Sequence, residues 1–95
     1  MTYELEFKHS AIKEWKKLGA TVQAQFKKKL ENVLDNPHVE SAKLSGGNEL
    51  YKIKLRQAGY RLVYEVNDAV ITVTVISVGK RDKGKVYKIA MDRIN

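Results

Sequence analysis

The chain has no cysteine, two histidines, one proline and no apolar run long enough to cross a membrane. Without cysteine it can form no disulfide and use no thiol nucleophile. The start of the chain carries no signal-peptide pattern, so we expect a cytoplasmic protein without membrane contact. His9 and His38 stand in unrelated contexts, and we expect both on the surface with no metal site.

Common catalytic motifs are missing as well. The chain has no Ser-His-Asp set, no phosphate-binding P-loop, no dinucleotide-binding glycine pattern and no paired carboxylates. These absences argue against serine hydrolases, nucleoside triphosphatases, dehydrogenases and glycosidases. The sequence implies no cofactor.

Positive charge is the strongest compositional feature of the chain. Lys and Arg number 18 against 11 Asp and Glu, which gives a net charge of +7 and a pI near 9.7. With 43% hydrophobic residues, the composition is that of a folded protein. We expect residues 1–95 to form one domain with a single modest core. The excess charge favours a nucleic acid, an acidic protein, or both as partners.

Two adjoining stretches, 51–56 and 60–66, alternate apolar and polar residues with a period of two. This pattern predicts two strands joined by a tight loop that contains Gly59. If Tyr60 lies opposite Leu55, each apolar side chain of one strand faces an apolar side chain of the other. A slip of one residue would undo this match, so the apolar pattern fixes the register.

The same register brings three cationic side chains together on the other face of the hairpin. Arg61 lies opposite Lys54, and Lys52 is two residues along the same face. Because like charges directly opposite each other destabilise a sheet, our central hypothesis is that an anion binds among them. The alternative is an ordinary solvated basic face, since strand edges often carry lysine that discourages aggregation.

Periodicity predicts the remaining elements. Capping candidates Ser10 and Thr21 precede helical patterns, and the stripe of the first includes Trp15, which we expect in the core. A β-branched run predicts a central last strand. The elements in order are a strand at 2–8, helices at 10–18 and 21–36, a loop at 36–49, strands at 51–56, 60–66 and 70–78, and a short helix from 86. The result is an α+β fold, β-α-α-β-β-β-α, with a mostly antiparallel four-stranded sheet, the helical hairpin on one face and the basic residues on the other.

Further cations flank the expected sheet. Three consecutive lysines in the second helix form either a solvated face or a contact to a phosphate backbone. After the last strand, Gly79 and Gly84 flank a cationic loop whose backbone can bend close to a bulky ligand. The final helix is expected to bury Val86, Ile89, Ala90 and Ile94, with Tyr87 off that stripe. The flanking residues expected to contact RNA are Lys27, Lys28, Lys29, Arg56, Lys80 and Lys83.

A cluster of Lys and Arg with one aromatic ring suits phosphodiester recognition, and it also suits RNA cleavage without a metal. The 2′-hydroxyl of RNA is a built-in nucleophile, so the protein must align it, neutralise charge and move two protons. Crowding by other cations lowers a lysine pKa, so either Lys52 or Lys54 is a candidate general base. Arg81 is the candidate acid by elimination, although arginine holds its proton tightly.

Five segments carry a resemblance to a known family. They are 15–19 (WKKLG), 51–56 (YKIKLR), 59–64 (GYRLVY), 75–81 (VISVGKR) and 86–87 (VY). In these residues, and over essentially its whole length, the chain resembles the RelE toxins of bacterial type II toxin–antitoxin modules. The hairpin together with the VGKR segment is the more specific part.

The resemblance implies a ribosome-dependent mRNA endonuclease that cleaves the codon in the ribosomal A site by attack of the 2′-hydroxyl and so inhibits translation. By residue match it implies that Lys52 and Lys54 bind base and phosphate and that Arg61 stabilises the transition state. It also implies that Arg81 is the acid and that Tyr87 orients or stacks on the mRNA base. Many wider relatives use a Glu and a His instead, and neither histidine here lies near the C-terminal loop.

The resemblance also implies partners. They are the 70S ribosome with mRNA and 16S rRNA, a RelB-like antitoxin that displaces the last helix, and operator DNA bound only by the toxin–antitoxin complex, which would repress its own operon. An alternative is a catalytically inactive co-repressor that binds nucleic acid or antitoxin. Such a protein would tolerate loss of the five site residues, and all five are present. A free ribonuclease would need an acid–base pair of better-matched pKa.

Overall fold

The computed structural model describes residues 2–45 and 49–94. Within them, helical periodicity and strand alternation give three α-helices, one short 3-10 turn and a four-stranded sheet. The elements are β1 (Glu4–Phe7), α1 (His9–Lys16), α2 (Ala20–Asp35), η1 (Glu40–Ala42), β2 (Leu50–Leu55), β3 (Tyr60–Asn67), β4 (Thr72–Lys80) and α3 (Lys85–Ile94). The predicted order and α+β class are confirmed. None of these helices is both long and apolar enough to cross a membrane.

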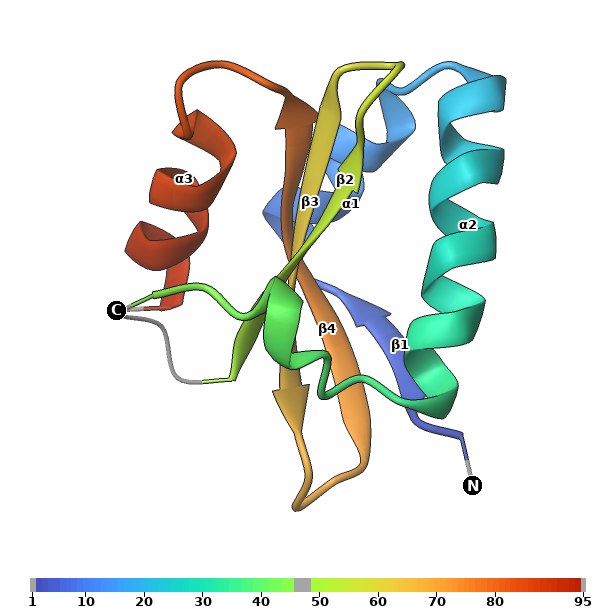
Figure 1. The fold of residues 1–95 in the computed structure, drawn as a ribbon, viewed down its shortest axis with the longest axis vertical. Coiled ribbons are helices and arrows are strands. Elements are labelled where there is room, and N and C mark those ends of the chain that lie inside the picture. Colours follow the sequence, from blue (N-terminus) through green and yellow to red (C-terminus); the bar gives the residue numbers. More distant parts are fainter. Residues whose placement is uncertain (1, 46–48, 95) are drawn as a thin grey trace.

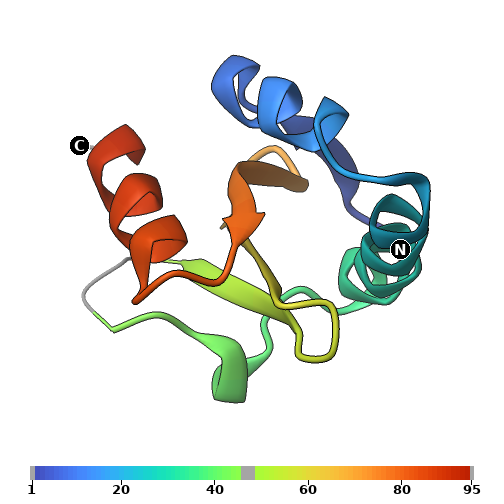
Figure 2. The same ribbon diagram turned by 90° about the horizontal axis from the view of Figure 1, so that it is seen from above.

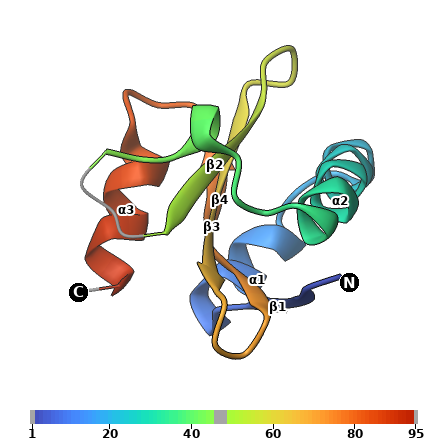
Figure 3. The same cartoon turned by 60° about the horizontal axis from the view of Figure 1, so that its bottom comes forward.

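Helices cover both faces of the sheet. In Figure 1 the sheet stands nearly edge-on between α3 and α2, and Figures 2 and 3 show α1 and α2 together on one side with α3 on the other. The helical hairpin therefore lies where it was predicted. The opposite, basic face is partly covered by α3.

The sheet has the strand order β1-β4-β3-β2. The antiparallel register of β2 and β3 is the predicted one, with Leu55 opposite Tyr60 and Lys54 opposite Arg61. β4 is an inner strand, as its β-branched sequence predicts, and it pairs in parallel with β1 on its other side. A register shift between Val63 and Tyr64 interrupts the ladder with β4.

Two apolar clusters hold the layers together. The larger lies between the sheet and the α1–α2 hairpin and includes Trp15, Phe26, Leu30 and the inner residues of all three long strands. Trp15 is 8% exposed, so its predicted place in the core is confirmed. The smaller cluster lies between the sheet and α3; its buried members are Leu44, Leu50, Val63, Ile76, Val86 and Ala90.

Both predicted helix starts were wrong. Helix α1 begins after Lys8 rather than after Ser10, and α2 begins after Gly19 rather than Thr21; neither N-cap residue makes a side-chain hydrogen bond. Instead, the carbonyls of Lys8 and Gly19 accept the first backbone bonds, from Ile12 and Gln23. The short link between the helices fixes both ends, and this tertiary constraint outweighs the preference of a hydroxyl side chain for the capping position.

Strand bounds also shift at the sheet's ends. β4 begins at Thr72 because the chain turns over residues 68–71, where Ile71 has a positive φ of 51°, so Val70 lies in the turn and is 64% exposed. Leu5 was expected on the inner face of the first strand, but it is 37% exposed because β1 is an edge strand.

The predicted loop at 36–49 contains more structure than its sequence indicates. It holds the 3-10 turn η1 and an isolated bridge between Lys43 and Tyr51, which lies beside the start of β2. Residues 46–48 of this predicted loop lie outside the described residues.

Candidate active site

The basic face of the β2–β3 hairpin forms as predicted. Alternation in the strands puts Lys52, Lys54 and Arg61 on the face opposite the α1–α2 hairpin, with Lys54 directly opposite Arg61. The two lysines are half-buried, but Arg61 is only 7% exposed. Its guanidinium donates to the carbonyl of Tyr60 at 2.9 Å. The expectation of an exposed basic face was therefore wrong for Arg61, which is buried near the start of the inner strand β3.

These cations have no carboxylate partner within 4 Å among the described residues. The pKa of Lys54 is lowered below its ordinary value. The largest cause is the positive charge of Lys52, followed by burial and then by the charges of Arg56 and Arg61. A lysine with a lowered pKa is easier to deprotonate and so better suited to act as a base.

The path of the backbone brings Arg81 to the end of the sheet where Lys54 and Arg61 lie. Gly79 on β4 pairs with Arg61, and Arg81 follows two residues later, just after β4 ends. Its backbone N–H donates to the carbonyl of Gly59 at 2.7 Å, which fastens the segment after β4 to the hairpin loop. Gly59 has a φ of +74°, a conformation that glycine adopts without strain. The exposed Arg81 thus lies beside the Lys54–Arg61 pair along the sheet.

Tyr87 was predicted to fall off the apolar stripe of the last helix, and this was wrong. The side of α3 that packs on the smaller cluster carries Val86, Tyr87, Ala90, Met91 and Ile94. These positions follow helical spacing, and the true stripe is rotated from the predicted one. The Tyr87 hydroxyl is buried and has no hydrogen-bond partner among the residues that the structure describes. An unpaired buried hydroxyl costs free energy, so a ligand or movement that satisfies it is favoured.

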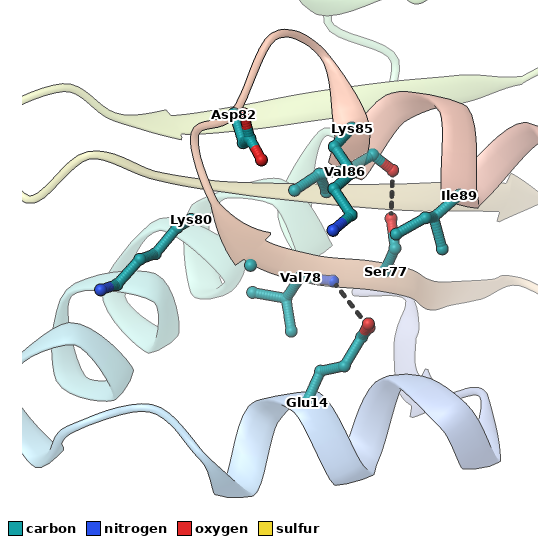
Figure 4. A pocket seen from close by; sticks show the side chains of 9 residues that line it. Glu14, Ser77, Val78, Lys80, Asp82, Lys85, Val86 and Ile89 are labelled. Atoms are coloured by element: carbon teal, nitrogen blue, oxygen red, sulfur yellow. Dashed lines mark hydrogen bonds between the residues drawn. The ribbon is translucent and has the colours of Figure 1, made fainter.

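The other predicted RNA-binding residues separate into two regions. Between α2 and the β2–β3 loop, a groove of about 430 Å³ is lined by Lys28, Lys29, Lys54 and Arg56 together with uncharged residues, whereas Lys27 does not line it. Lys80 lines a second cavity, of about 280 Å³, between α1 and α3 (Figure 4). Lys83 is exposed in the link before α3 and has a φ of 48°, a strained value for a residue with a side chain.

A polar cluster at the other end of β3 was not found from the sequence. His38 Nε2 lies 2.9 Å from Asp68 Oδ1, and His38 Nδ1 lies 3.1 Å from Glu49 Oε2. The Tyr51 hydroxyl donates to Glu49, and the Tyr3 hydroxyl donates to Asp68 at 2.7 Å. Burial, followed by Glu49, raises the pKa of Tyr51 to about 12, which keeps it a donor.

The His38 side chain is 35% exposed and so reaches the surface, as expected, but it is held by hydrogen bonds that the sequence did not predict. The ligating atoms of His38, Glu49 and Asp68 lie within 4.8 Å of one another, a spacing that a metal ion could bridge. Hydrogen bonds already join the group, and it ties the loop before β2 to the β3–β4 turn.

Known toxins resemble this chain in sequence over most of its length. The family described as the ParE toxin of the type II toxin–antitoxin system parDE matches residues 5–84. The mRNA interferase toxin RelE of Escherichia coli K12 is 55% identical over 94 residues, 99% of each chain, and a putative RelE-like toxin of E. coli is 49% identical over the same share.

Solved structures agree with these matches. A mutant of E. coli toxin RelE in the free state superposes with a TM-score of 0.92, at 54% identity and full coverage of both chains. The toxin in the intact E. coli RelBE toxin–antitoxin complex gives a TM-score of 0.82 at 56% identity, covering 85% of this chain and 99% of that one.

Proposed function

Because the chain belongs to the family of RelE and ParE toxins from type II toxin–antitoxin systems, we propose that it is an mRNA-cleaving endoribonuclease that inhibits translation. The observation that carries this proposal is the basic face. Lys52, Lys54 and Arg61 gather without carboxylate partners among the described residues, and Arg81 joins them at one end of the sheet. A phosphodiester is the ligand that best offsets their mutual repulsion.

The proposed reaction uses the substrate's own nucleophile. Lys54, in its neutral form, takes the proton from the 2′-hydroxyl, and the 2′-oxygen attacks the adjacent phosphorus. The bond from phosphorus to the 5′-oxygen of the next nucleotide breaks, leaving a 2′,3′-cyclic phosphate. Arg61 and Lys52 stabilise the negative charge that builds on the phosphoryl oxygens. The departing 5′-oxygen receives its proton from Arg81.

Tyr87 has a separate role in this proposal. Its ring lies at the start of α3 and next to the sheet face that carries the basic residues. Stacking on an mRNA base would hold the cleaved linkage in line, which an unstructured RNA strand does not do by itself. The RNA would also have to bring a partner to the buried hydroxyl or displace it from its pocket.

The ribosome supplies what the isolated surface lacks. Lys52 and Lys54 are half-buried and Arg61 is buried, so the basic face offers few exposed groups that could select one RNA conformation. We therefore propose that cleavage requires the 70S ribosome, with mRNA bound in the A site and 16S rRNA contacting the flanking cations Lys27, Lys28, Lys29, Arg56, Lys80 and Lys83. Phosphate contacts of this kind position a protein without reading sequence.

The proposed protein partner is a RelB-like antitoxin. Solved relatives include an intact toxin–antitoxin complex and a mutant toxin in complex with an antitoxin peptide. An acidic antitoxin would complement the net charge of +7. The pair would bind operator DNA only as a complex and so repress its own operon.

Substitution of the two arginines tests the proposal. Arg61→Ala or Arg81→Ala should relieve growth arrest while ribosome binding persists, because each removes charge at the transition state rather than the whole RNA-binding surface. Loss of one such group costs about 10²–10³-fold in rate. A double variant that still arrests growth would contradict the assignment.

A further inference from the structure

Among residues 2–45 and 49–94, no strand lies beside about half of the outer edge of β4. β1 pairs only with Thr72–Val75, and the chain then leaves the sheet, with the N–H of Lys8 donating to the carbonyl of Val75 at 3.0 Å. β4 continues to Lys80. Its backbone groups beyond Val75 on this side therefore need other partners, since unpaired edges invite unwanted pairing.

Two side chains from distant parts of the sequence cover this edge. Glu14 on α1 accepts the N–H of Val78 with Oε1 at 3.2 Å, as Figure 4 shows. Arg93 on α3 donates to the carbonyl of Ile76 at 2.8 Å. The two side chains also bond to each other, with Nη1 to Oε1 at 2.8 Å and Nη2 to Oε2 at 3.1 Å.

The Glu14–Arg93 pair joins α1 to α3 next to a cavity between the two helices. The cavity of about 280 Å³ lies between α1 and α3 beside it (Figure 4). The side chains of Glu14 and Arg93 are only 26% and 22% exposed, so their bonds are shielded from competing water more than those of a surface ion pair. At the other end of α3, the buried hydroxyl of Ser77 donates to the carbonyl of Val86 at 2.9 Å.

We propose that Glu14 and Arg93 are positioning residues for the RNA cleavage assigned above. The pair fixes the C-terminal half of α3 against β4, and α3 carries Tyr87 at its start. Without the pair, the helix would rest on its apolar contacts and, within the part of the chain that the structure describes, on the bond from Ser77. Tyr87 would then lose its fixed distance from Lys54 and Arg61. The catalytic part of this proposal rests on the proposed function; the structural part does not.

Hydrogen exchange and single-turnover cleavage test the two parts separately. In Arg93→Ala, which removes three hydrogen bonds, the amides of α3 should exchange at least about tenfold faster. Ribosome-dependent cleavage should slow by about 10- to 100-fold through misplacement of Tyr87, while affinity for the ribosome stays within about twofold. Asp92→Ala, which removes an exposed charge from the neighbouring position, should leave both unchanged. Arg93→Lys, which keeps the charge and one donor, should lie in between.

Charge reversal distinguishes an edge cap from a simple ion pair. Glu14→Arg combined with Arg93→Glu restores the attraction between the two side chains. It also sets a donor against the N–H of Val78 and an acceptor against the carbonyl of Ile76, so it should not restore α3 protection or cleavage. Glu14→Gln keeps the acceptor for Val78 and should lose less than the reversal.

Different outcomes would overturn the structural part and the catalytic part of the proposal. Recovery in the reversed pair, or wild-type protection of α3 in Arg93→Ala, would overturn the edge cap. Faster exchange with an unchanged cleavage rate, or with a higher one, would overturn the positioning role. If the wild-type protein itself fails to cleave mRNA on ribosomes, the proposed function fails, and the exchange measurements still decide whether the pair holds α3.

Discussion

Among single residues, Lys54 shows most directly how repulsion between cations lowers a pKa and so favours a role as a base. Its pKa is lowered chiefly by Lys52, a neighbour on the same strand. Since the folded state disfavours the charged lysine, the unfolded chain binds this proton more tightly, and stability rises as pH increases toward the ordinary lysine pKa. At neutral pH, repulsion of the charged Lys54 by its neighbours lowers the stability of the folded state. The same repulsion makes Lys54 easier to deprotonate and so a better base.

Lys54→Gln should therefore separate activity from stability. We expect cleavage to fall by about 10²–10³-fold, with no loss, or a small gain, in the urea midpoint at neutral pH. The cleavage rate of the wild-type protein should rise with pH until Lys54 is deprotonated, and the variant should lack this rise. Lys52→Gln is the matched control, because it removes a charge from the same face. A pH-dependent rise that disappears in Lys52→Gln and survives in Lys54→Gln would assign the base to Lys52 instead.

Asp68 provides a second residue-level prediction. Hydrogen bonds from Tyr3 and then His38 lower the pKa of its carboxyl. A lowered carboxyl pKa contributes stability that is present above the unfolded value, near 3.9, and is lost as pH falls through the folded value. The free energy of unfolding of Asp68→Asn should thus fall less steeply than that of the wild type between about pH 5 and 2. The exposed Asp35→Asn is the control and should follow the wild-type slope.

Sequence reasoning was most reliable where a residue's role depends on its strand neighbours. The apolar match alone placed Lys54 opposite Arg61, because a period of two leaves one register that buries every apolar side chain. It failed for His38, whose partners Glu49 and Asp68 come from separate segments with no shared periodicity. It also failed for the burial of Arg61, which strand alternation alone does not indicate.

At the scale of whole elements, α2 and the β2–β3 hairpin together form the groove lined by Lys28 and Lys29. The three consecutive lysines look equivalent in the sequence, but Lys27 does not line the groove. Helical geometry explains this, since neighbours on a helix are about 100° apart. Lys27, which lies on the same helical turn but outside the groove, is therefore a control for Lys28.

The groove lysines should lie close to RNA when the protein is bound to ribosomes. Because the chain has no cysteine, Lys28→Cys creates a unique thiol for a photoreactive crosslinker, and Lys27→Cys is its matched control. We expect crosslinks to RNA from position 28 in several-fold excess over position 27. Sequencing the crosslinked RNA distinguishes mRNA from 16S rRNA. Equal crosslinking at both positions would remove the groove from the RNA-binding surface.

Helix ends show why element bounds resisted prediction. Ser10 and Thr21 are favourable N-caps in isolation, yet α1 and α2 begin earlier because a three-residue link, 17–19, must return the chain across the sheet. The stripe of α3 was misplaced for a similar reason. Its contact surface was set by the small cluster around Leu50 and Ile76, which lie far away in the sequence.

In the molecule as a whole, one face of the sheet holds most of the core and the other carries the basic residues. The α1–α2 face holds the larger apolar cluster and most of the core. The other face carries cations that have no carboxylate partner within 4 Å among the described residues, and the smaller apolar cluster and a few polar bonds hold α3 beside them. This division accounts for a protein of net charge +7 that folds as a compact body and still carries a basic face for the proposed contact with RNA. The order of elements could be read from the sequence, whereas the partial cover of the basic face by α3 required the structure.

Primer extension on one translated message, with and without 70S ribosomes, tests the central claim most directly. We predict cuts within A-site codons only when ribosomes are present, and their loss in Arg61→Ala and Arg81→Ala at the same ribosome occupancy. Equal cutting of the naked message would contradict the requirement for the ribosome. Unchanged cutting by a protein that lacks both arginines would contradict the assignment of the basic face as the site of cleavage.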